Sequence, residues 1–172
     1  MKTGKTKTLA VTALLLAMNI IMSMSMFSIP VPGGHMYLND LVICTAAILL
    51  SPFYAFVVGG IGAFLGDMFF YPYPMFVSLV THGVQAVVIS LCTRRLLKNH
   101  REAASIIGAV LGLIITVAGY TFGRAYIYGT VEYAIVKLPY QILQTAVGEA
   151  LSLLLCWRLR LVSIFEKQFG KQ

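Results

Sequence analysis

The sequence predicts an all-α, polytopic membrane protein, a bundle of six transmembrane helices with both termini in the cytoplasm. Three observations support this prediction. Of the 172 residues, 59% are hydrophobic and only 11% are charged, which leaves too little polar surface for an ordinary water-soluble domain. The apolar residues form segments long enough to cross a bilayer. The basic residues gather in short clusters at the ends of those segments.

The first apolar segment, residues 8–29, follows Lys2, Lys5 and Lys7. About 22 residues at ~1.5 Å each are enough to cross a hydrocarbon core of ~30 Å. A basic start before an apolar run is also typical of a secretory signal peptide, but no small-residue cleavage site follows before Pro30. We therefore expect a helix that stays in the mature protein.

The second apolar stretch, residues 39–70, is too long for one crossing, because a single helix of that length would measure about 48 Å. Ser51-Pro52 interrupts it in the middle, and proline favours a break because it has no backbone N–H to donate. The sequence therefore predicts two spans, at 39–51 and 53–71, of which the first is short.

Three further spans are expected, at residues 75–97, 103–128 and 131–157. Lysine and arginine are enriched on the cytoplasmic side of membrane proteins. If the N-terminal lysines are cytoplasmic, the basic cluster at 94–101 is on the same side only when residues 39–70 cross the membrane twice. All 13 basic residues except Arg124 and Lys137 then lie inside. We expect one integral membrane domain over residues 1–172.

Motifs for catalysis are missing from the sequence. It contains no HExxH, no GxSxG and no set of residues at metal-ligand spacing, and its three cysteines stand singly inside apolar runs. We therefore expect no enzyme activity, no catalytic residue, no metal and no cofactor. The net charge of +7 comes mostly from clusters that flank apolar segments, a pattern typical of membrane topology rather than of nucleic-acid binding.

Polar side chains inside the predicted spans indicate where a ligand would bind. A charge at the centre of a bilayer costs roughly 3 kcal/mol, so each one needs a partner or a pocket. Asp67 and Glu149 are the two clear cases. Asp67 is close to the outer Tyr-Pro loop, whereas Glu149 belongs to a polar stripe that favours a helix contact. Ser78, His82 and Gln85 fall at i, i+4 and i+7 and therefore share one helix face.

A second polar face occurs in the last predicted span, where Gln141 and Gln144 accompany Lys137 and Tyr140. Lys137 either lines a site or extends to the outer interface. Arg124 either binds a carboxylate or phosphate, or anchors its helix together with neighbouring tyrosines, which would then form an aromatic belt.

The first outer loop, residues 32–40, contains polar side chains and flexible glycines and is expected to fold over the mouth of a pocket as a lid. Asn39 and Asp40 also suit the N-cap of the following helix. A few polar groups converging in an apolar bundle favour capture of a small amphipathic molecule. The expected substrate-binding residues are His35, Tyr37, Asn39, Asp67, Tyr71, Ser78, His82, Gln85, Arg124, Tyr140, Gln141 and Gln144.

Three sequence patterns together resemble a known family. The patterns are Ala13-Leu-Leu-Leu-Ala17 in the first span, Gly34-His-Met-Tyr-Leu-Asn-Asp40 in the outer loop, and Gly59-Gly-Ile-Gly-Ala-Phe-Leu-Gly-Asp67 before a Tyr-Pro loop. With six predicted spans in 172 residues, the chain resembles the substrate-binding S component of an energy-coupling factor (ECF) vitamin transporter, which is an ABC-type importer. It is most similar to the hydroxymethylpyrimidine- and pyridoxine-type members.

The resemblance implies a multi-pass protein of a bacterial plasma membrane that captures a vitamin from outside with high affinity. It implies docking on a transmembrane coupling (T) subunit driven by two ATPase subunits, with toppling in the membrane to release the cargo inward. Ala13 and Ala17 would contact the coupling subunit, because small side chains permit close helix approach. The resemblance implies no nucleic-acid partner.

The resemblance leaves the vitamin open, as well as whether the coupling module is dedicated or shared. A lysine would be usual near the position of His82, so substrate assignments do not transfer directly. Pyridoxine or hydroxymethylpyrimidine suits His82, Gln85 and Asp67. Pantothenate would instead use Arg124 or Lys137 against its carboxylate, and riboflavin and folate are larger than this set of groups suggests.

Two other classes of function are compatible with these residues. The chain would be an autonomous proton-coupled secondary transporter if Asp67 and Glu149 were its proton sites. It would be a structural or assembly protein without a ligand if the two polar faces met with no cavity between them.

Overall fold

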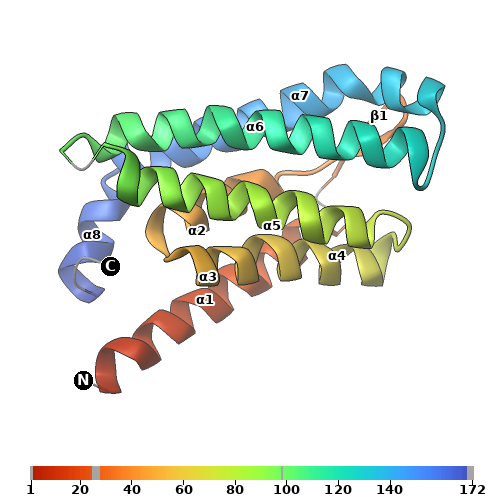
Figure 1. Cartoon of the computed structure of the whole chain (residues 1–172). Coiled ribbons are helices and arrows are strands. Elements are labelled where there is room, and N and C mark those ends of the chain that lie inside the picture. Colours follow the sequence, from red (N-terminus) through yellow and green to blue (C-terminus); the bar gives the residue numbers. More distant parts are fainter. Residues whose placement is uncertain (1, 25–27, 98, 170–172) are drawn as a thin grey trace.

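Long helices form where the apolar segments were predicted (Figure 1). The computed structural model describes residues 2–24, 28–97 and 99–169. Helices α5 (Met75–Leu91), α6 (Arg101–Tyr126) and α7 (Val131–Leu153) pack in sequence order, α5 against α6 and α6 against α7. Helix α1 (Lys2–Met22) lies on the other side of the bundle, and both termini are at the same end of the molecule.

The stretch between residues 39 and 70 breaks where the sequence predicts. Helix α2 (Asn39–Leu49) ends, the backbone becomes extended at Leu50 and Ser51, and α3 (Pro52–Phe56) begins with the proline at its first position. That position suits proline, because the first N–H groups of a helix have no partner within the helix. The chain continues through a π-helical turn, η2 (Val57–Ile61), into α4 (Gly62–Phe70).

Close packing between η2 and α5 depends on glycine. A Cβ atom on Gly59 would lie 2.8 Å from the Cβ of Ala86 and 2.9 Å from the backbone oxygen of His82. Such distances leave no room for a larger residue, so the glycine lets the two backbones approach. This contact fixes the part of α5 that carries His82.

Two of the predicted spans, 75–97 and 131–157, end in π-helical turns. Helix α5 runs on into η3 (Cys92–Leu96) and α7 into η4 (Leu154–Arg158), and a short helix, α8 (Leu161–Phe169), follows. Val162 and Phe165 of α8 are buried in the apolar core. No helix after residue 157 was predicted from the sequence.

The first predicted span is shorter than expected. Helix α1 ends at Met22, and Ile29, the expected last residue of that span, lies in β1 (Ile29–Val31), which pairs with β2 (Gly34–Met36) as an antiparallel hairpin. Gly33 and Gly34 have φ values of 79° and 121°, which glycine adopts without strain. Hydropathy did not indicate this end of the helix, because the run of apolar residues continues past Met22. Residues 25–27 of that segment lie outside the described residues.

The cap expected at the start of α2 is also wrong. The residue before the helix is Leu38, no side chain caps it, and both Asn39 and Asp40 are buried inside the helix. Asp40 is completely buried and bonds to other helices instead.

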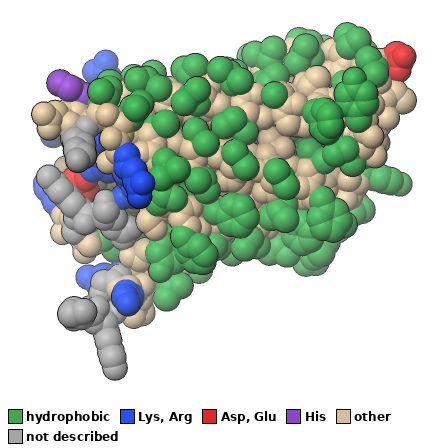
Figure 2. Space-filling view, viewed as in Figure 1, with side chains coloured by type: hydrophobic (Ala, Val, Ile, Leu, Met, Phe, Trp, Pro, Cys, Tyr) green, Lys and Arg blue, Asp and Glu red, His purple; other side chains and the backbone are tan. Residues whose placement is uncertain are grey.

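Within the described residues, several helices have the length and composition of membrane-spanning helices. Four helical segments are long and apolar enough to cross a bilayer: Lys5–Met22, Pro52–Phe70, Met75–Leu96 and Arg101–Tyr126. The apolar α2 is shorter, and α7 is long but contains Glu132, Lys137 and Glu149. Hydrophobic side chains cover most of the visible face, while lysine and arginine gather at the end that carries the termini (Figure 2).

The interior divides into an apolar and a polar half. The apolar core joins α2, α5 and α8 through residues such as Ile43, Ile48, Ile89 and Phe165. The break after α2 is held there by α5 and η3, because Ser90 of α5 and Arg94 of η3 donate hydrogen bonds to the backbone oxygen of Leu50. Buried polar side chains dominate the other half, away from the termini.

Candidate functional site

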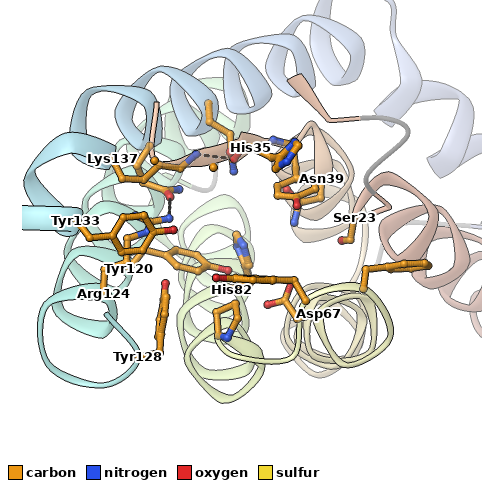
Figure 3. Close-up of a pocket in the computed structure, with 18 residues that line it drawn as sticks. Ser23, His35, Asn39, Asp67, His82, Tyr120, Arg124, Tyr128, Tyr133 and Lys137 are labelled. Atoms are coloured by element: carbon orange, nitrogen blue, oxygen red, sulfur yellow. Dashed lines mark hydrogen bonds between the residues drawn. The ribbon is translucent and has the colours of Figure 1, made fainter. Parts of the chain in front are cut away.

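A pocket of about 290 Å³ opens at the end of the bundle away from the termini. This is close to the lower limit of the ~300–1,000 Å³ typical of small-molecule sites. The β1–β2 hairpin, the end of α4, the end of α6 and the start of α7 surround it (Figure 3). Its lining residues are Ser23, Gly33, Gly34, His35, Tyr37, Asn39, Asp67, Phe70, Tyr71, Pro74, His82, Tyr120, Arg124, Tyr128, Tyr133, Lys137, Gln141 and Gln144.

The hairpin forms one wall of the pocket and is bonded to α7. Lys137 Nζ donates a hydrogen bond to the backbone oxygen of His35 at 2.6 Å (Figure 3). The backbone N–H of Tyr37 donates to Gln144 Oε1 at 3.0 Å. The expected covering loop is therefore a short hairpin held against α7 at two points.

The opposite wall contains Asp67, which is supported from behind. The Ser78 hydroxyl donates a hydrogen bond to Asp67 Oδ2. Because Ser78 has only one proton to donate, its oxygen accepts from the Tyr120 hydroxyl at 2.6 Å. Ser78 itself is fully buried and does not line the pocket.

Two buried cations line the pocket beside the hairpin. Arg124 and Lys137 are 6% and 3% exposed. Arg124 Nη2 donates to Gln141 Oε1 at 2.6 Å, and its guanidinium lies 5.2 Å from the centre of the Tyr120 ring. Its Nη1 has no hydrogen-bond partner among the described residues, and neither cation has an acidic partner in that part of the chain. This wall therefore offers N–H donors to a ligand.

His82 forms the floor of the pocket. Its ring packs edge-on against Tyr120, with centroids 5.3 Å apart, and its Nδ1 lies 2.7 Å from Gln85 Oε1. Gln85 is fully buried below it and contacts two carboxyl groups, Asp40 Oδ1 at 3.1 Å and Glu149 Oε1 at 3.0 Å. Gln85 thus supports the floor without lining the pocket.

Asp40 is the centre of the polar cluster below the pocket. Its Oδ2 accepts hydrogen bonds from Gln144 Nε2 at 3.3 Å and Thr145 Oγ1 at 3.4 Å, in addition to the contact with Gln85. These bonds join α2 to α5 and α7. From the sequence, Asp40 was expected in the outer loop or as a helix cap, and not in a buried cluster.

Three tyrosines in the connecting segments supply phenol groups to the pocket. Burial raises the pKa of Tyr37 and of Tyr71 above the ordinary value for tyrosine. Burial also raises the pKa of Tyr128 well above that value, even though the nearby Arg124 acts in the opposite direction. These hydroxyls therefore remain protonated at neutral pH and can donate hydrogen bonds.

Most of the residues expected from the sequence meet in this pocket, and three do not. The pocket contains His35, Tyr37, Asn39, Asp67, Tyr71, His82, Arg124, Gln141 and Gln144. Ser78 and Gln85 lie behind its wall and floor, and Tyr140 does not line it either. Ala13 and Ala17, the expected docking residues, are exposed on the outer face of α1.

Tyr120, Tyr128 and Tyr133 line the pocket although none was among the expected binding residues, and Lys137 lines it, as one of the two alternatives for this residue predicted. Helical spacing in the sequence could have indicated Tyr120 and Lys137 as lining residues. Tyr120 precedes Arg124 by one helical turn, and Lys137 precedes Gln141 by one turn, so each shares a helix face with an expected residue.

A family model and one of two similar proteins are named as transporters. The family model described as "ECF-type riboflavin transporter, S component" matches residues 3–161. The chain is similar to the "Thiamine precursor transporter HmpT" of Lactococcus lactis subsp. cremoris, with 31% identity over 151 residues, which are 85% of this chain and 83% of that protein. It is also 32% identical over 103 residues to an "Uncharacterized protein in gap 3'region" of Pyrococcus woesei, which are 59% of this chain and 68% of that one.

Proposed function

The chain belongs to the family of S components of ECF-type transporters, and on that premise we propose that it captures a one-ring vitamin or vitamin precursor, either hydroxymethylpyrimidine or pyridoxine. Members of this family are polytopic proteins of the cell membrane that take part in vitamin uptake, and they are not enzymes. The substrate, the six-span topology and the subunits that this chain binds are our proposals.

The volume of the pocket carries the choice of substrate. About 290 Å³ is at the lower limit for small-molecule sites, so the pocket suits a single heteroaromatic ring with small polar substituents better than a three-ring flavin with its sugar-alcohol chain. The family model names riboflavin, while the Lactococcus relative is named for a thiamine precursor. Aromatic walls from Tyr71, Tyr120 and Tyr128, together with His82 and Asp67, suit a flat, polar ring.

The proposed topology has six spans, α1, α2, the α3–η2–α4 segment, α5, α6 and α7, with both termini in the cytoplasm. It is supported by the lysines and arginines at the end that carries the termini (Figure 2). The pocket, at the other end, would then face the exterior, where the vitamin is captured. That the cell is bacterial stays a prediction.

We propose that the chain works with a transmembrane T subunit and two ATPase subunits, with α1 as the contact surface. Ala13 and Ala17 are exposed on α1 together with Leu14 and Met18. Small side chains on a lipid-facing helix permit a partner helix to pack closely.

The experiment is to measure binding and transport separately. The purified chain is titrated with hydroxymethylpyrimidine, pyridoxine, pantothenate and riboflavin by isothermal calorimetry, and uptake of the bound vitamin is followed in vesicles with and without the coupling module. We expect saturable binding of one of the first two and uptake only with the module and ATP. Uptake by the chain alone, abolished by an uncoupler, would instead establish a proton-driven carrier and contradict the proposal.

One observation favours pantothenate as a second candidate. Arg124 and Lys137 are buried in the pocket with no acidic partner among the described residues, and a ligand carboxylate would supply one. The variant Arg124→Gln discriminates between the candidates. It should reduce the affinity for pantothenate by at least about a hundredfold if a buried ion pair is lost, and the affinity for an uncharged alcohol by much less.

A further inference from the structure

Gln85 bridges His82 to two carboxyl groups below the pocket. Its Nε2 lies 3.1 Å from Asp40 Oδ1 and 3.0 Å from Glu149 Oε1, and its Oε1 lies 2.7 Å from His82 Nδ1. Gln85, Asp40 and His82 are at most 1% exposed, and Glu149 is 3% exposed. The amide is therefore enclosed and bonded at both of its ends.

The chemistry of the partners determines where the carbonyl oxygen and the NH₂ group of the Gln85 amide lie. A carboxylate only accepts hydrogen bonds, so the end of Gln85 that faces Asp40 must be the NH₂ group. The carbonyl oxygen then faces His82, and because an amide oxygen only accepts, His82 Nδ1 must carry a hydrogen.

A neighbouring amide confirms the role of Asp40 as an acceptor. Gln144 Oε1 accepts from the backbone N–H of Tyr37, which can only donate, so the NH₂ group of Gln144 faces Asp40 Oδ2. Thr145 Oγ1 is bonded to the same carboxylate oxygen, and Gln141 Nε2, whose own oxygen accepts from Arg124, donates to Thr145. The hydrogen bonds of this cluster therefore point toward Asp40.

This direction determines what His82 presents to the pocket. A neutral imidazole that donates through Nδ1 has a lone pair on Nε2. His82 lines the pocket, and its Nε2 has no partner among the described residues. Among the described residues, no carboxylate oxygen lies within hydrogen-bond distance of the buried ring, the nearest, on Asp40, being 3.8 Å from Nδ1.

We propose that Nε2 of His82 is a hydrogen-bond acceptor for the substrate, which must present an N–H or O–H group at the floor of the pocket. Gln85, Asp40 and Glu149 are positioning residues that hold His82 in this tautomer. The inference rests on the proposed function only in taking this pocket as the substrate site. It defines the class of ligand group at the floor: an amino or hydroxyl group is accepted, while a carboxylate or an ether oxygen is repelled by the lone pair.

The ligand classes proposed above differ at this point. Hydroxymethylpyrimidine has an amino group and a hydroxymethyl group on its ring, and pyridoxine has several hydroxyl groups, so each offers a donor to Nε2. A carboxylate, by contrast, would have to bind at the other side of the pocket, near Arg124 and Lys137. The floor therefore selects for a donor whichever candidate is the substrate.

The first experiment needs no ligand. The full chain is prepared with nitrogen-labelled histidine, and the imidazole nitrogens are observed by NMR at neutral pH. The signals of His82 are assigned by their loss in the variant His82→Phe, which leaves His35 and His100 in place. We expect a protonated Nδ1 and an unprotonated Nε2. A proton on Nε2, either alone or together with one on Nδ1, would overturn the proposal.

The second experiment tests the positioning residue. Gln85→Leu removes the acceptor for Nδ1, so the His82 signals should shift toward a mixture of tautomers and the affinity for hydroxymethylpyrimidine should fall by about tenfold or more. Ser90→Ala, which removes another buried polar group of α5, should leave the tautomer and the affinity unchanged. An unchanged tautomer in a folded Gln85→Leu protein would contradict the positioning role.

The third experiment removes the donor from the ligand instead of the acceptor from the protein. The deamino and deoxy analogues of hydroxymethylpyrimidine are compared with the parent compound. One of them should bind the native chain about tenfold or more weakly, and that difference should disappear in His82→Phe. If both analogues bind the native chain as well as the parent does, the proposal fails, whether or not Gln85→Leu folds. If none of the compounds binds, the proposed substrate is wrong while the NMR result still decides the tautomer.

Discussion

Lys137 reaches from α7 to the backbone oxygen of His35 in the hairpin, with a nitrogen–oxygen distance of 2.6 Å. The cation is 3% exposed, so this bond is shielded from water. It is the more direct of the two connections that hold the hairpin against the helix, the other being the bond from the backbone of Tyr37 to Gln144. The hairpin is therefore positioned by a side chain that begins on a different wall of the pocket.

The variant Lys137→Met should weaken this connection. Because the hairpin covers one side of the pocket, we expect the bound vitamin to dissociate faster by about threefold to thirtyfold, with a smaller change in the association rate. Stopped-flow or filter-binding kinetics measure both rates. Lys167→Met, on α8, is the control and should change neither rate. Equal dissociation rates in the native chain and Lys137→Met would show that the connection does not retain the ligand.

Ser78→Ala should reduce binding although Ser78 does not touch the pocket. The substitution removes the bridge between Tyr120 and Asp67, and each loss of a buried partner costs about 1–3 kcal/mol. We expect a lower unfolding temperature and an affinity lower by about tenfold, since Asp67 and Tyr120 both line the pocket. Thermal unfolding in detergent and calorimetric titration measure the two effects.

Thr116→Val is a matched control for that variant. Thr116 is fully buried on α6, and its hydroxyl has no hydrogen-bond partner among the described residues. Replacing it with a methyl group of similar shape should leave stability equal or higher. If Thr116→Val and Ser78→Ala were equally destabilising, the bridge at Ser78 would have no special role.

Gly148→Ala should disturb the contact between α2 and α7. A Cβ atom at this position would lie 2.6 Å from Asp40 Cβ and 3.0 Å from the backbone nitrogen of Leu41, so α2 must move away. Overpacking of this kind costs about 1–3 kcal/mol, and here it also displaces the carboxylate below His82. We expect a lower unfolding temperature and weaker vitamin binding. Val147→Ala, at the neighbouring exposed position, should change binding little.

Ala13→Trp and Ala17→Trp should separate capture from transport. Both side chains are exposed on α1, away from the pocket, so the isolated chain should bind its vitamin with unchanged affinity. Uptake in vesicles that contain the coupling module should fall by about tenfold or more, because a large side chain prevents close helix contact. Val110→Trp places the same bulk on the exposed face of α6 and should leave uptake intact. Normal uptake by both α1 variants would exclude this face as the docking surface.

The sequence was sufficient for those parts of the fold that depend on local chemistry. The break at Ser51-Pro52 is confirmed. It was predictable because proline has no backbone N–H to donate, so it disfavours the interior of a helix and suits its first turn. The end of α1 was not predictable from hydropathy, since the apolar run continues from Met22 into a segment that includes the hairpin. The glycines and prolines at residues 30–34 are typical of a turn and were the feature of the sequence that indicated the hairpin.

Within the candidate site, helical periodicity identified faces but neither depth nor neighbours. Ser78, His82 and Gln85 share one face of α5 as predicted, yet only His82 reaches the pocket. The Ser78 hydroxyl is hydrogen-bonded to Asp67 and Tyr120 behind the pocket wall. Gln85 lies deeper and is bonded to two carboxyl groups. The partners come from other helices, so their positions follow from tertiary packing and cannot be read from the spacing along one helix.

The filled interior below His82 limits the route by which cargo can leave. Gln85, Asp40 and Glu149 close the base of the pocket, and the apolar side chains around Ile43 and Ile89 occupy the space beyond them. Among the described residues, these side chains separate the pocket from the end of the molecule that carries the termini. Under the proposed function, release of the vitamin on the side of the termini therefore requires a movement of the helices or of the whole chain.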